Sequence, residues 1–248
     1  MMNILLIGLN NPIAYELEKS LKKKSFVLYS ISSTKSSSAT CKIDLSNEFK
    51  ANFLKRKIKE IININFDCII NFSTLGSNYD VGLNLLSINL KIYKNISIIL
   101  KNLNFRKFIN ISSIYVNELS KKENNLKNDA YYALSKYLSE YIFLSEFKNK
   151  IIINLRLPQI ISPRYKYKGA LNSLFMDINK NNHIKLYGNA NRIIKYIHIS
   201  DAIDILVKIL KSKKTKLIKI NGKKITLKNY ATDLINRYGN KNTKITYY

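Results

Sequence analysis

Cysteine, histidine, proline, glycine and tryptophan are all scarce in this 248-residue sequence. It has two cysteines, two histidines, three prolines, seven glycines and no tryptophan. Two histidines without a Cys/His cluster leave little material for a metal site, and we predict none. Cys41 and Cys68 both lie in apolar runs, which is typical of reduced core cysteines in a cytoplasmic protein rather than of a disulfide or a reactive thiol.

Long hydrophobic runs and targeting signals are also missing. No apolar run approaches the roughly 18 residues that a membrane span needs. The opening residues, MMNILLIGLN, carry no basic segment and no cleavage-like small residues, so we expect no signal peptide. With 46% hydrophobic residues, a chain of this length can bury the core of one domain with a small appendage.

Acidic residues are few: 16 Asp and Glu face 42 Lys and Arg, for a net charge of +26. Such a charge raises the hypothesis of a nucleic-acid binder, which DNA retention that collapses with modest salt would support. The lysines are scattered, however, and the densest groups, at 22–24 and 211–216, fall at predicted helix ends, where cations suit the helix dipole. We therefore favour a solvated basic surface without nucleic acid, which would still attract an anionic small molecule.

Short apolar runs alternate with helical patterns along most of the chain. This alternation predicts an α/β fold, a doubly wound parallel sheet of the Rossmann type with helices on both faces. We place this domain at residues 1–160 and a small mixed α/β substrate lobe at 161–248, which returns at least one strand and helix to the main domain. The predicted strands are 3–7, 26–31, 42–45, 67–72, 105–111 and 151–157, and the helices between them include 12–24, 47–62 and 81–103.

The first strand ends in a turn that resembles a dinucleotide-binding fingerprint. The pattern G-x-x-G-x-x-G is represented by Gly8, Asn11 and Ala14. Asn tolerates left-handed backbone better than most residues, and Ala is small enough for close helix–sheet packing. The alternative is a plain strand–turn–helix connection, which the missing glycines leave open.

The second strand ends without the acidic residue that would bind an adenosine ribose. Ser32 and, further on, Lys35 stand there instead, and a hydroxyl with a cation leans slightly towards the 2′-phosphate of NADP over NAD. Other strand ends carry Asp44, Ser73 and Ser113. Because ligands bind at the carboxyl ends of parallel strands, we expect these positions to line one site.

Tyr132 and Lys136 are spaced by four residues in a helical pattern, so both side chains lie on one helix face. An ammonium beside a phenol favours the phenolate, and such a pair can exchange a proton with a substrate hydroxyl or carbonyl. The spacing alone means little, because Tyr and Lys are so common here that it also occurs at Tyr15 and Lys19. The context distinguishes the later pair, since Ser113 ends a strand shortly before it.

Together, the segments of the chain resemble the extended short-chain dehydrogenase/reductase superfamily in its NAD-dependent epimerase/dehydratase (nucleotide-sugar) branch. The resemblance runs over nearly the whole chain, and each motif is loose while their order is fairly specific. The matching segments are ILLIG, KIDLS, DCIINFS, INL, FINISSIYV, YALSK, LRLPQIISP, LYGNANRIIKYIHISDAIDIL and INGKKITLKNYATDLI.

The resemblance implies roles for the catalytic residues. Tyr132 would be the general acid/base, Ser113 would hydrogen-bond the reacting oxygen, and Lys136 would bind the nicotinamide ribose. The resemblance also implies a cofactor-binding set and a substrate-binding set. The cofactor set is Gly8, Asn11, Ala14, Ser32, Lys35, Asp44, Leu45, Phe72, Ser73, Asn89, Lys136 and Pro158, and the substrate set is Ser113, Tyr132, Gln159, Arg192 and Lys195.

The departures from the family pattern limit what it implies. The arginine expected to hold the substrate diphosphate falls at Ile194, leaving Arg192 and Lys195 as substitutes. The acidic pair that a dehydratase would use is absent at 113–115. We therefore expect an epimerase or ketoreductase that acts on a nucleotide-linked sugar, in surface-polysaccharide sugar biosynthesis. A catalytically degenerate dinucleotide-binding scaffold or sensor is the alternative. The superfamily often forms homodimers through Rossmann helices, and the sequence leaves this open.

Overall fold

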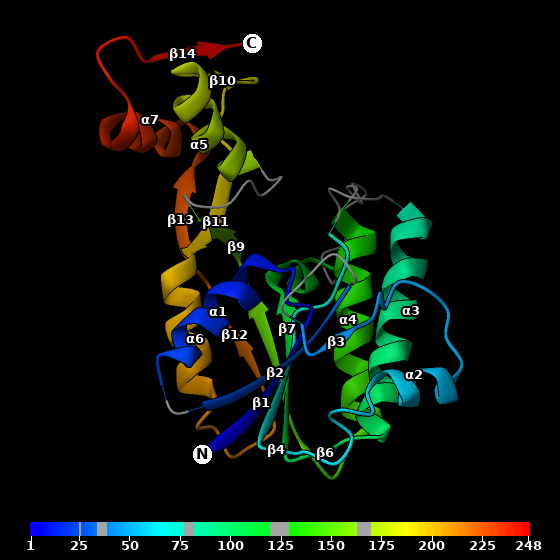
Figure 1. Ribbon diagram of the computed structural model, residues 1–248. Coiled ribbons are helices and arrows are strands. Elements are labelled where there is room, and N and C mark those ends of the chain that lie inside the picture. Colours follow the sequence, from blue (N-terminus) through cyan, green and yellow to red (C-terminus); the bar gives the residue numbers. More distant parts are fainter. Residues whose placement is uncertain (25, 34–38, 77–81, 120–128, 163–169) are drawn as a thin grey trace. The chain divides into compact units, whose positions relative to one another are not determined.

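A seven-stranded parallel sheet is the centre of this computed structural model (Figure 1). The structure describes all residues except 25, 34–38, 77–81, 120–128 and 163–169. The strand order is β12-β8-β7-β5-β1-β2-β3, and every neighbouring pair is parallel. The order reverses beside β1, where a ligand crevice forms in such sheets. The strands are β1 (Met2–Ile7), β2 (Phe26–Ser32), β3 (Cys41–Lys42), β5 (Cys68–Asn71), β7 (Lys107–Ser113), β8 (Ile151–Leu157) and β12 (Lys216–Lys219).

Helices cover both faces of this sheet, which confirms the predicted doubly wound fold. Figure 1 shows α1 and α6 on one face and α2, α3 and α4 on the other. None of the helices in the described part of the chain is long and apolar enough to cross a membrane. The helices are α1 (Pro12–Lys22), α2 (Ala51–Lys57), α3 (Gly82–Lys101), α4 (Asp129–Glu146) and α6 (Ile199–Ile209), with a short 3₁₀ helix η1 (Ile114–Glu118).

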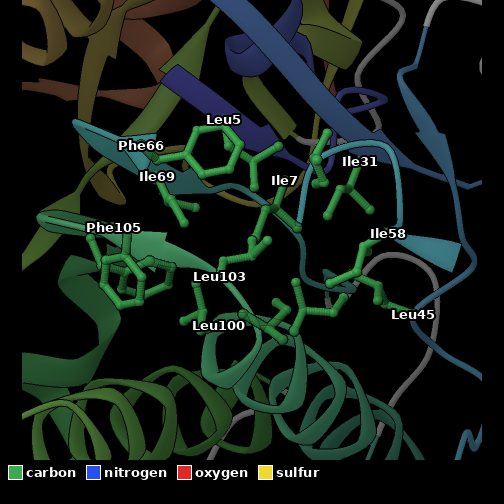
Figure 2. Close-up of a cluster of buried hydrophobic side chains, with 14 of the residues drawn as sticks. Leu5, Ile7, Ile31, Leu45, Ile58, Phe66, Ile69, Leu100, Leu103 and Phe105 are labelled. Atoms are coloured by element: carbon green, nitrogen blue, oxygen red, sulfur yellow. The ribbon is translucent and has the colours of Figure 1, made fainter. Parts of the chain in front are cut away.

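The hydrophobic core between the sheet and α2, α3 and α4 explains why the strands are continuous apolar runs. Leu5 and Ile7, two residues apart on β1, place their side chains on the same face of the sheet (Figure 2). Both are fully buried, as are Ile69 on β5 and Phe108 on β7. Burial of each such side chain stabilises the fold by about 1.5–3 kcal/mol.

Contacts divide the chain into two compact units. The first contains Met1–Leu157 and Ile203–Ile220, and the second contains Pro158–Ala202 and Asn221–Tyr248. The second unit has its own core, which includes Leu171 and Ile184. Its small sheets pair β13-β11-β9 and β10-β14, and its elements are β9 (Gln159–Ile161), α5 (Ala170–Asn181), β10 (His183–Leu186), β11 (Ile193–His198), β13 (Lys223–Thr226), α7 (Leu227–Tyr238) and β14 (Lys244–Tyr247).

Three predicted elements differ from the structure by more than a shift of one or two residues at an end. The helix predicted at 47–62 is only α2, because Ile58 leaves the helical region with φ −104° and ψ 13°. The strand predicted at 42–45 ends at Lys42, because Asp44 instead accepts a hydrogen bond from the Ser46 amide at 3.1 Å and forms a local turn. The strand predicted at 105–111 is divided between β6 (Asn104–Phe105), which pairs with β4 (Asn65–Phe66), and β7.

Candidate functional site

Gly8 follows β1 in a conformation that favours glycine, with φ +91°. Its amide donates to the Ile31 carbonyl oxygen at 2.7 Å, which ties the turn to the end of β2. A Cβ atom at this position would lie 2.8 Å from the Ser73 backbone nitrogen. The turn after β1 and the loop after β5 are therefore in direct backbone contact, and only glycine fits between them.

Asn11 begins α1 and fixes the direction of that helix. Its side-chain oxygen accepts a hydrogen bond from the Ile13 amide at 2.9 Å, and its amide nitrogen lies 3.5 Å from the Phe72 carbonyl oxygen. Ala14, one turn later, is fully buried against the sheet. The positive end of the α1 dipole therefore lies beside Gly8, with no acidic residue in the first turn.

Four more predicted cofactor residues lie in the sequence at or after the ends of β2 and β3. Ser32 is buried, and its hydroxyl has no hydrogen-bond partner among the residues that the structure describes. Lys35 lies outside the described residues. Asp44 is exposed in its turn, whereas Leu45 is part of the hydrophobic core, and Asn95 of α3 donates to the Leu45 carbonyl oxygen at 2.9 Å.

Lys136 of α4 is buried, with 2% of its surface exposed. Its ammonium donates to the Ile111 carbonyl oxygen of β7 at 2.8 Å and lies 5.8 Å from the centre of the Tyr132 ring. Burial lowers the pKa of the Lys136 ammonium to about 7, and the negative charge of Glu140 partly opposes that change. Tyr132 itself is half-buried. A buried cation is thus held beside a tyrosine that solvent or a ligand can reach.

The pair formed by Tyr15 and Lys19 has the same spacing but a different environment. The Lys19 ammonium lies 4.3 Å from the centre of the Tyr15 ring, closer than in the later pair. The Lys19 side chain is 50% exposed, however, and makes a weak ion pair with Glu16 at 3.8 Å. The distance from the ammonium to the tyrosine ring does not distinguish the two pairs. They differ because Lys136 is buried and donates a hydrogen bond to a backbone carbonyl oxygen.

Ser113 ends β7 two residues after Ile111, whose carbonyl oxygen binds Lys136. It is 6% exposed, and its hydroxyl oxygen accepts a hydrogen bond from the Tyr115 amide at 3.3 Å. This bond caps η1 and fixes the serine side chain at the carboxyl end of the strand. A serine hydroxyl that accepts one hydrogen bond can also donate one to another acceptor.

The remaining predicted residues, Pro158, Gln159, Arg192 and Lys195, belong to the second unit. Gln159 on β9 is half-buried and is the register partner of Tyr196 on β11. Arg192 and Lys195 are exposed. Lys195 stands opposite Lys224 in the antiparallel pair of β11 and β13. Because like charges directly across a strand pair repel each other, an anion bound between these two lysines would relieve the repulsion.

One family model covers most of the sequence. It describes the NAD dependent epimerase/dehydratase family and matches residues 4–221. The chain belongs to this family. No curated protein matches the sequence significantly.

Solved structures of similar fold agree with the family assignment. Thermus thermophilus UDP-glucose 4-epimerase, in complex with NAD, matches with a TM-score of 0.80 and 16% identity, over 99% of this chain and 86% of the other. Bacillus anthracis dTDP-glucose 4,6-dehydratase, also with NAD, matches with a TM-score of 0.76 and 16% identity, over 100% and 84%. Helicobacter pylori ADP-L-glycero-D-manno-heptose-6-epimerase gives 0.74 and 17%, over 99% and 84%. At these identities the likeness shows the fold.

Sequence reasoning missed the ion pair that supports α4 in this family member. Arg156 of β8 and Glu140 of α4 are both buried. The Arg156 guanidinium donates to the two Glu140 oxygens at 2.8 and 2.6 Å, and the Ser112 hydroxyl donates to the same carboxylate. Glu140 stands one helical turn after Lys136, a spacing that could have suggested a shared face, but its partner on β8 carries no local signal.

A hollow of about 460 Å³ lies at the amino ends of the strands, opposite the carboxyl edge that carries Gly8 and Ser113. It is lined by residues at the starts of β4, β6 and β8, including Asp67, Arg106 and Lys150. It contains none of the predicted site residues, and ligands of doubly wound sheets bind at the other edge. We therefore assign no role to this hollow.

Proposed function

We propose that the protein is an NAD(P)-dependent enzyme that epimerises or reduces a nucleotide-linked sugar. The observation that carries this proposal is the environment of Lys136, a buried ammonium held by the Ile111 carbonyl oxygen beside the half-buried Tyr132. Burying a cation costs desolvation free energy, so we look for a function that its charge serves. Stabilising a tyrosinate in the transition state of proton transfer is such a reason.

Three features of the first unit fit a dinucleotide. Gly8 makes a tight turn against the Ser73 backbone, which is the role of the first glycine of a dinucleotide fingerprint. Asn11 caps α1 without adding negative charge, which leaves the helix N-terminus suited to a pyrophosphate. The buried Ser32 hydroxyl, unpaired among the described residues, would gain a partner from a ribose or a ribose phosphate. When bound, a nicotinamide dinucleotide supplies the hydride acceptor and donor.

The roles of the residues then follow from their chemistry. Tyr132 takes a proton from a sugar hydroxyl or returns one to a carbonyl. Lys136 stabilises the phenolate and hydrogen-bonds a ribose, and Ser113 donates its hydroxyl hydrogen to the reacting oxygen. Return of hydride to the opposite face of the sugar gives epimerisation, whereas one delivery gives reduction.

The substrate class rests on the structural neighbours and on the cationic second unit. The neighbours are named for UDP-glucose, dTDP-glucose and ADP-heptose, all diphosphate-linked sugars. Arg192 and Lys195, with Gln159, are the groups that we propose contact the substrate. Lys35 and Ser32 favour NADP slightly over NAD. We further propose that the enzyme works in the cytoplasm, in the supply of sugars for a surface polysaccharide.

Two experiments, cofactor binding and then substrate turnover, test this proposal. The purified protein is titrated with NADH and NADPH by fluorescence and then incubated with UDP-, dTDP- and ADP-linked sugars, with products identified by mass spectrometry. The Tyr132→Phe variant should bind cofactor as the wild type does but lose turnover by about 10²-fold or more. Tyr15→Phe is the matched control, because Tyr15 has the same spacing to a lysine on an exposed face, and it should keep full activity.

Each alternative gives a distinct result. Cofactor binding without turnover of any of these sugars would favour a dinucleotide-binding scaffold. Equal activity of Tyr132→Phe and Tyr15→Phe would refute the assigned acid/base. Absence of binding to either dinucleotide would remove the oxidoreductase proposal altogether.

A further inference from the structure

Three asparagines form a hydrogen-bonded row across the buried centre of the sheet. Asn71 of β5, Asn110 of β7 and Asn154 of β8 are register partners. Asn71 donates to the Asn110 side-chain oxygen at 3.1 Å, and Asn110 donates to the Asn154 side-chain oxygen at 3.1 Å. All three are at most 2% exposed. Each amide is thus oriented by the next, from one strand to its neighbour.

This row joins the loop after β5 to α4. At one end, the Asn71 side-chain oxygen accepts a hydrogen bond from the Ser73 amide at 2.9 Å, and Ser73 is the residue that packs against Gly8. In the middle, Asn110 donates its second hydrogen to the Ser139 hydroxyl at 2.9 Å. Ser139 in turn donates to the Lys136 carbonyl oxygen at 2.7 Å. A continuous chain of hydrogen bonds therefore runs from the Ser73 amide, which packs against Gly8, to the turn of α4 that carries Lys136.

A second connection, one helical turn earlier, repeats the arrangement. Asn89 of α3 accepts from the Leu75 amide at 2.7 Å and donates to the Leu75 carbonyl oxygen at 3.0 Å. Its other amide hydrogen goes to the Ser135 hydroxyl at 3.1 Å, and Ser135 donates to the Tyr132 carbonyl oxygen at 2.8 Å. With the Thr74 hydroxyl also donating to its oxygen at 3.3 Å, the Asn89 amide makes all four of its hydrogen bonds within the protein. Any effect of Asn89 on a cofactor therefore acts through the loop.

Burying these asparagine amides costs free energy, which indicates that they have a role beyond packing. Asparagine is unfavourable inside strands, and a buried amide is tolerated only when its hydrogen bonds are made. Valine or isoleucine would fill the same positions with better packing. The backbone amides of Ser73 and Leu75, which donate hydrogen bonds to asparagine side-chain oxygens, lie at the carboxyl edge of the sheet. The serines that complete the connections lie on the helix that carries Tyr132 and Lys136.

We propose that Asn89 and Asn110 are positioning residues that hold the loop Phe72–Leu75 at a fixed spacing from α4. They keep the backbone beside Gly8 in register with Tyr132 and Lys136. This inference rests on the proposed function in one respect, namely that a dinucleotide lies against the loop. The fixed position of the loop itself does not depend on any ligand, so the two parts can be tested separately.

Hydrogen–deuterium exchange of the ligand-free protein tests the position of the loop. In Asn89→Ala the Leu75 amide loses its acceptor, and the peptide that contains residues 73–75 should exchange at least about ten times faster than in the wild type. Ser97→Ala is the matched control, since Ser97 is a buried α3 residue whose hydroxyl bonds Glu146 instead. It should leave exchange at 73–75 unchanged. Unchanged exchange in Asn89→Ala would overturn the inference.

Titration with NADH and NADPH tests the consequence. Asn89→Ala and Ser139→Ala should raise the dissociation constant of the better-bound dinucleotide about ten-fold, and Ser139→Thr, which retains the hydroxyl, should restore it. Ser97→Ala should stay within about two-fold of the wild type. Faster loop exchange with an unchanged dissociation constant would reduce the asparagines to a stability role and refute the positioning role. If the wild type binds neither dinucleotide, the proposed function fails, and the exchange experiment alone decides whether the loop is held.

Asn110→Ala tests the row at its centre, where it removes three buried hydrogen bonds at once. If that variant does not fold, Ser139→Ala still removes the connection to α4 while leaving the three asparagines intact. An increase in exchange at residues 73–75 in Ser139→Ala supports the inference. Exchange that equals the wild type in this variant, with dinucleotide affinity unchanged, contradicts it.

Discussion

Arg156 and Glu140 form a buried ion pair with two hydrogen bonds, at 2.8 and 2.6 Å, on the helix face that carries Lys136. The third nitrogen of the guanidinium, Nη1, donates to the Asn117 side-chain oxygen at 2.6 Å. The pair therefore joins β8 to α4 and to the 3₁₀ helix that follows Ser113. Because both charges are removed from water, each depends on the other.

Arg156→Met should be strongly destabilising, because it leaves the Glu140 carboxylate buried without its cation. We expect a loss of about 3–5 kcal/mol in the free energy of unfolding, measured by urea denaturation. The double variant Arg156→Met/Glu140→Leu should recover much of this loss. Arg237→Ala is the control, since it breaks an exposed pair with Asp233 and should change stability by less than about 0.5 kcal/mol. Equal effects of the two single variants would contradict the argument.

Gly8→Ala should cost more than the left-handed backbone alone explains. The φ of +91° costs an alanine about 1–2 kcal/mol, and its Cβ would also lie 2.8 Å from the Ser73 nitrogen. Gly82→Ala also has a positive φ, of +65°, and no described residue lies within 4 Å of the added carbon, so it isolates the backbone cost. Chemical denaturation should show Gly8→Ala as the less stable variant. Equal denaturation midpoints for the two variants would mean that the loop after β5 moves away from the added carbon at no measurable cost.

The sequence predicted the sheet because buried parallel strands are continuous apolar runs. Gly8, Ser73 and Ser113 could be placed at one edge for the same reason, since each follows such a run. The pattern could not separate Tyr132–Lys136 from Tyr15–Lys19 by spacing. Only the structure shows that Lys136 is buried and Lys19 exposed. Burial depends on tertiary packing, which a four-residue motif does not encode.

The asparagine row was not predictable in the same way. Asn71 and Asn110 are 39 residues apart in the sequence, and Asn110 and Asn154 are 44 apart. Each looked like a single polar interruption in an apolar strand. Their pairing appears only when strand order and register are known, because a shift of one residue would turn each amide to the other face of the sheet.

The two cysteines should be unreactive in the folded protein. Burial raises the pKa of the Cys68 thiol to about 12, and burial together with Glu60 raises that of Cys41 to about 11. The thiolate is the reactive form, so iodoacetamide at pH 8 should leave the native protein unmodified and add two labels in urea. Intact-mass spectrometry provides the measurement, and Cys68→Ala assigns each label. Rapid addition of one label to native protein would show that a cysteine is accessible.

Lys136 makes stability depend on pH in a specific direction. Its pKa is lowered from 10.5 to about 7 in the folded protein, so between these pH values the unfolded chain binds one more proton at this site. Stability therefore rises with pH in this interval, and the full cost of burying the ammonium is present below pH 7. Glu140 and the adjacent Arg156 largely compensate each other, and Tyr132 is the other titratable neighbour on α4.

The variant Lys136→Met removes this dependence and so measures it. Relative to the wild type, its gain in unfolding free energy should be largest at about pH 6 and should fall by up to about 1.4 kcal/mol per pH unit between about pH 7 and 10. Urea denaturation of both proteins across this range gives the difference, in which unrelated titrations cancel. Lys19→Met, at an exposed lysine, should differ from the wild type by an amount that does not change with pH. A constant difference for Lys136→Met as well would show that the Lys136 amine has the same pKa in the folded and unfolded protein, and the cost assigned to burying its charge would be wrong.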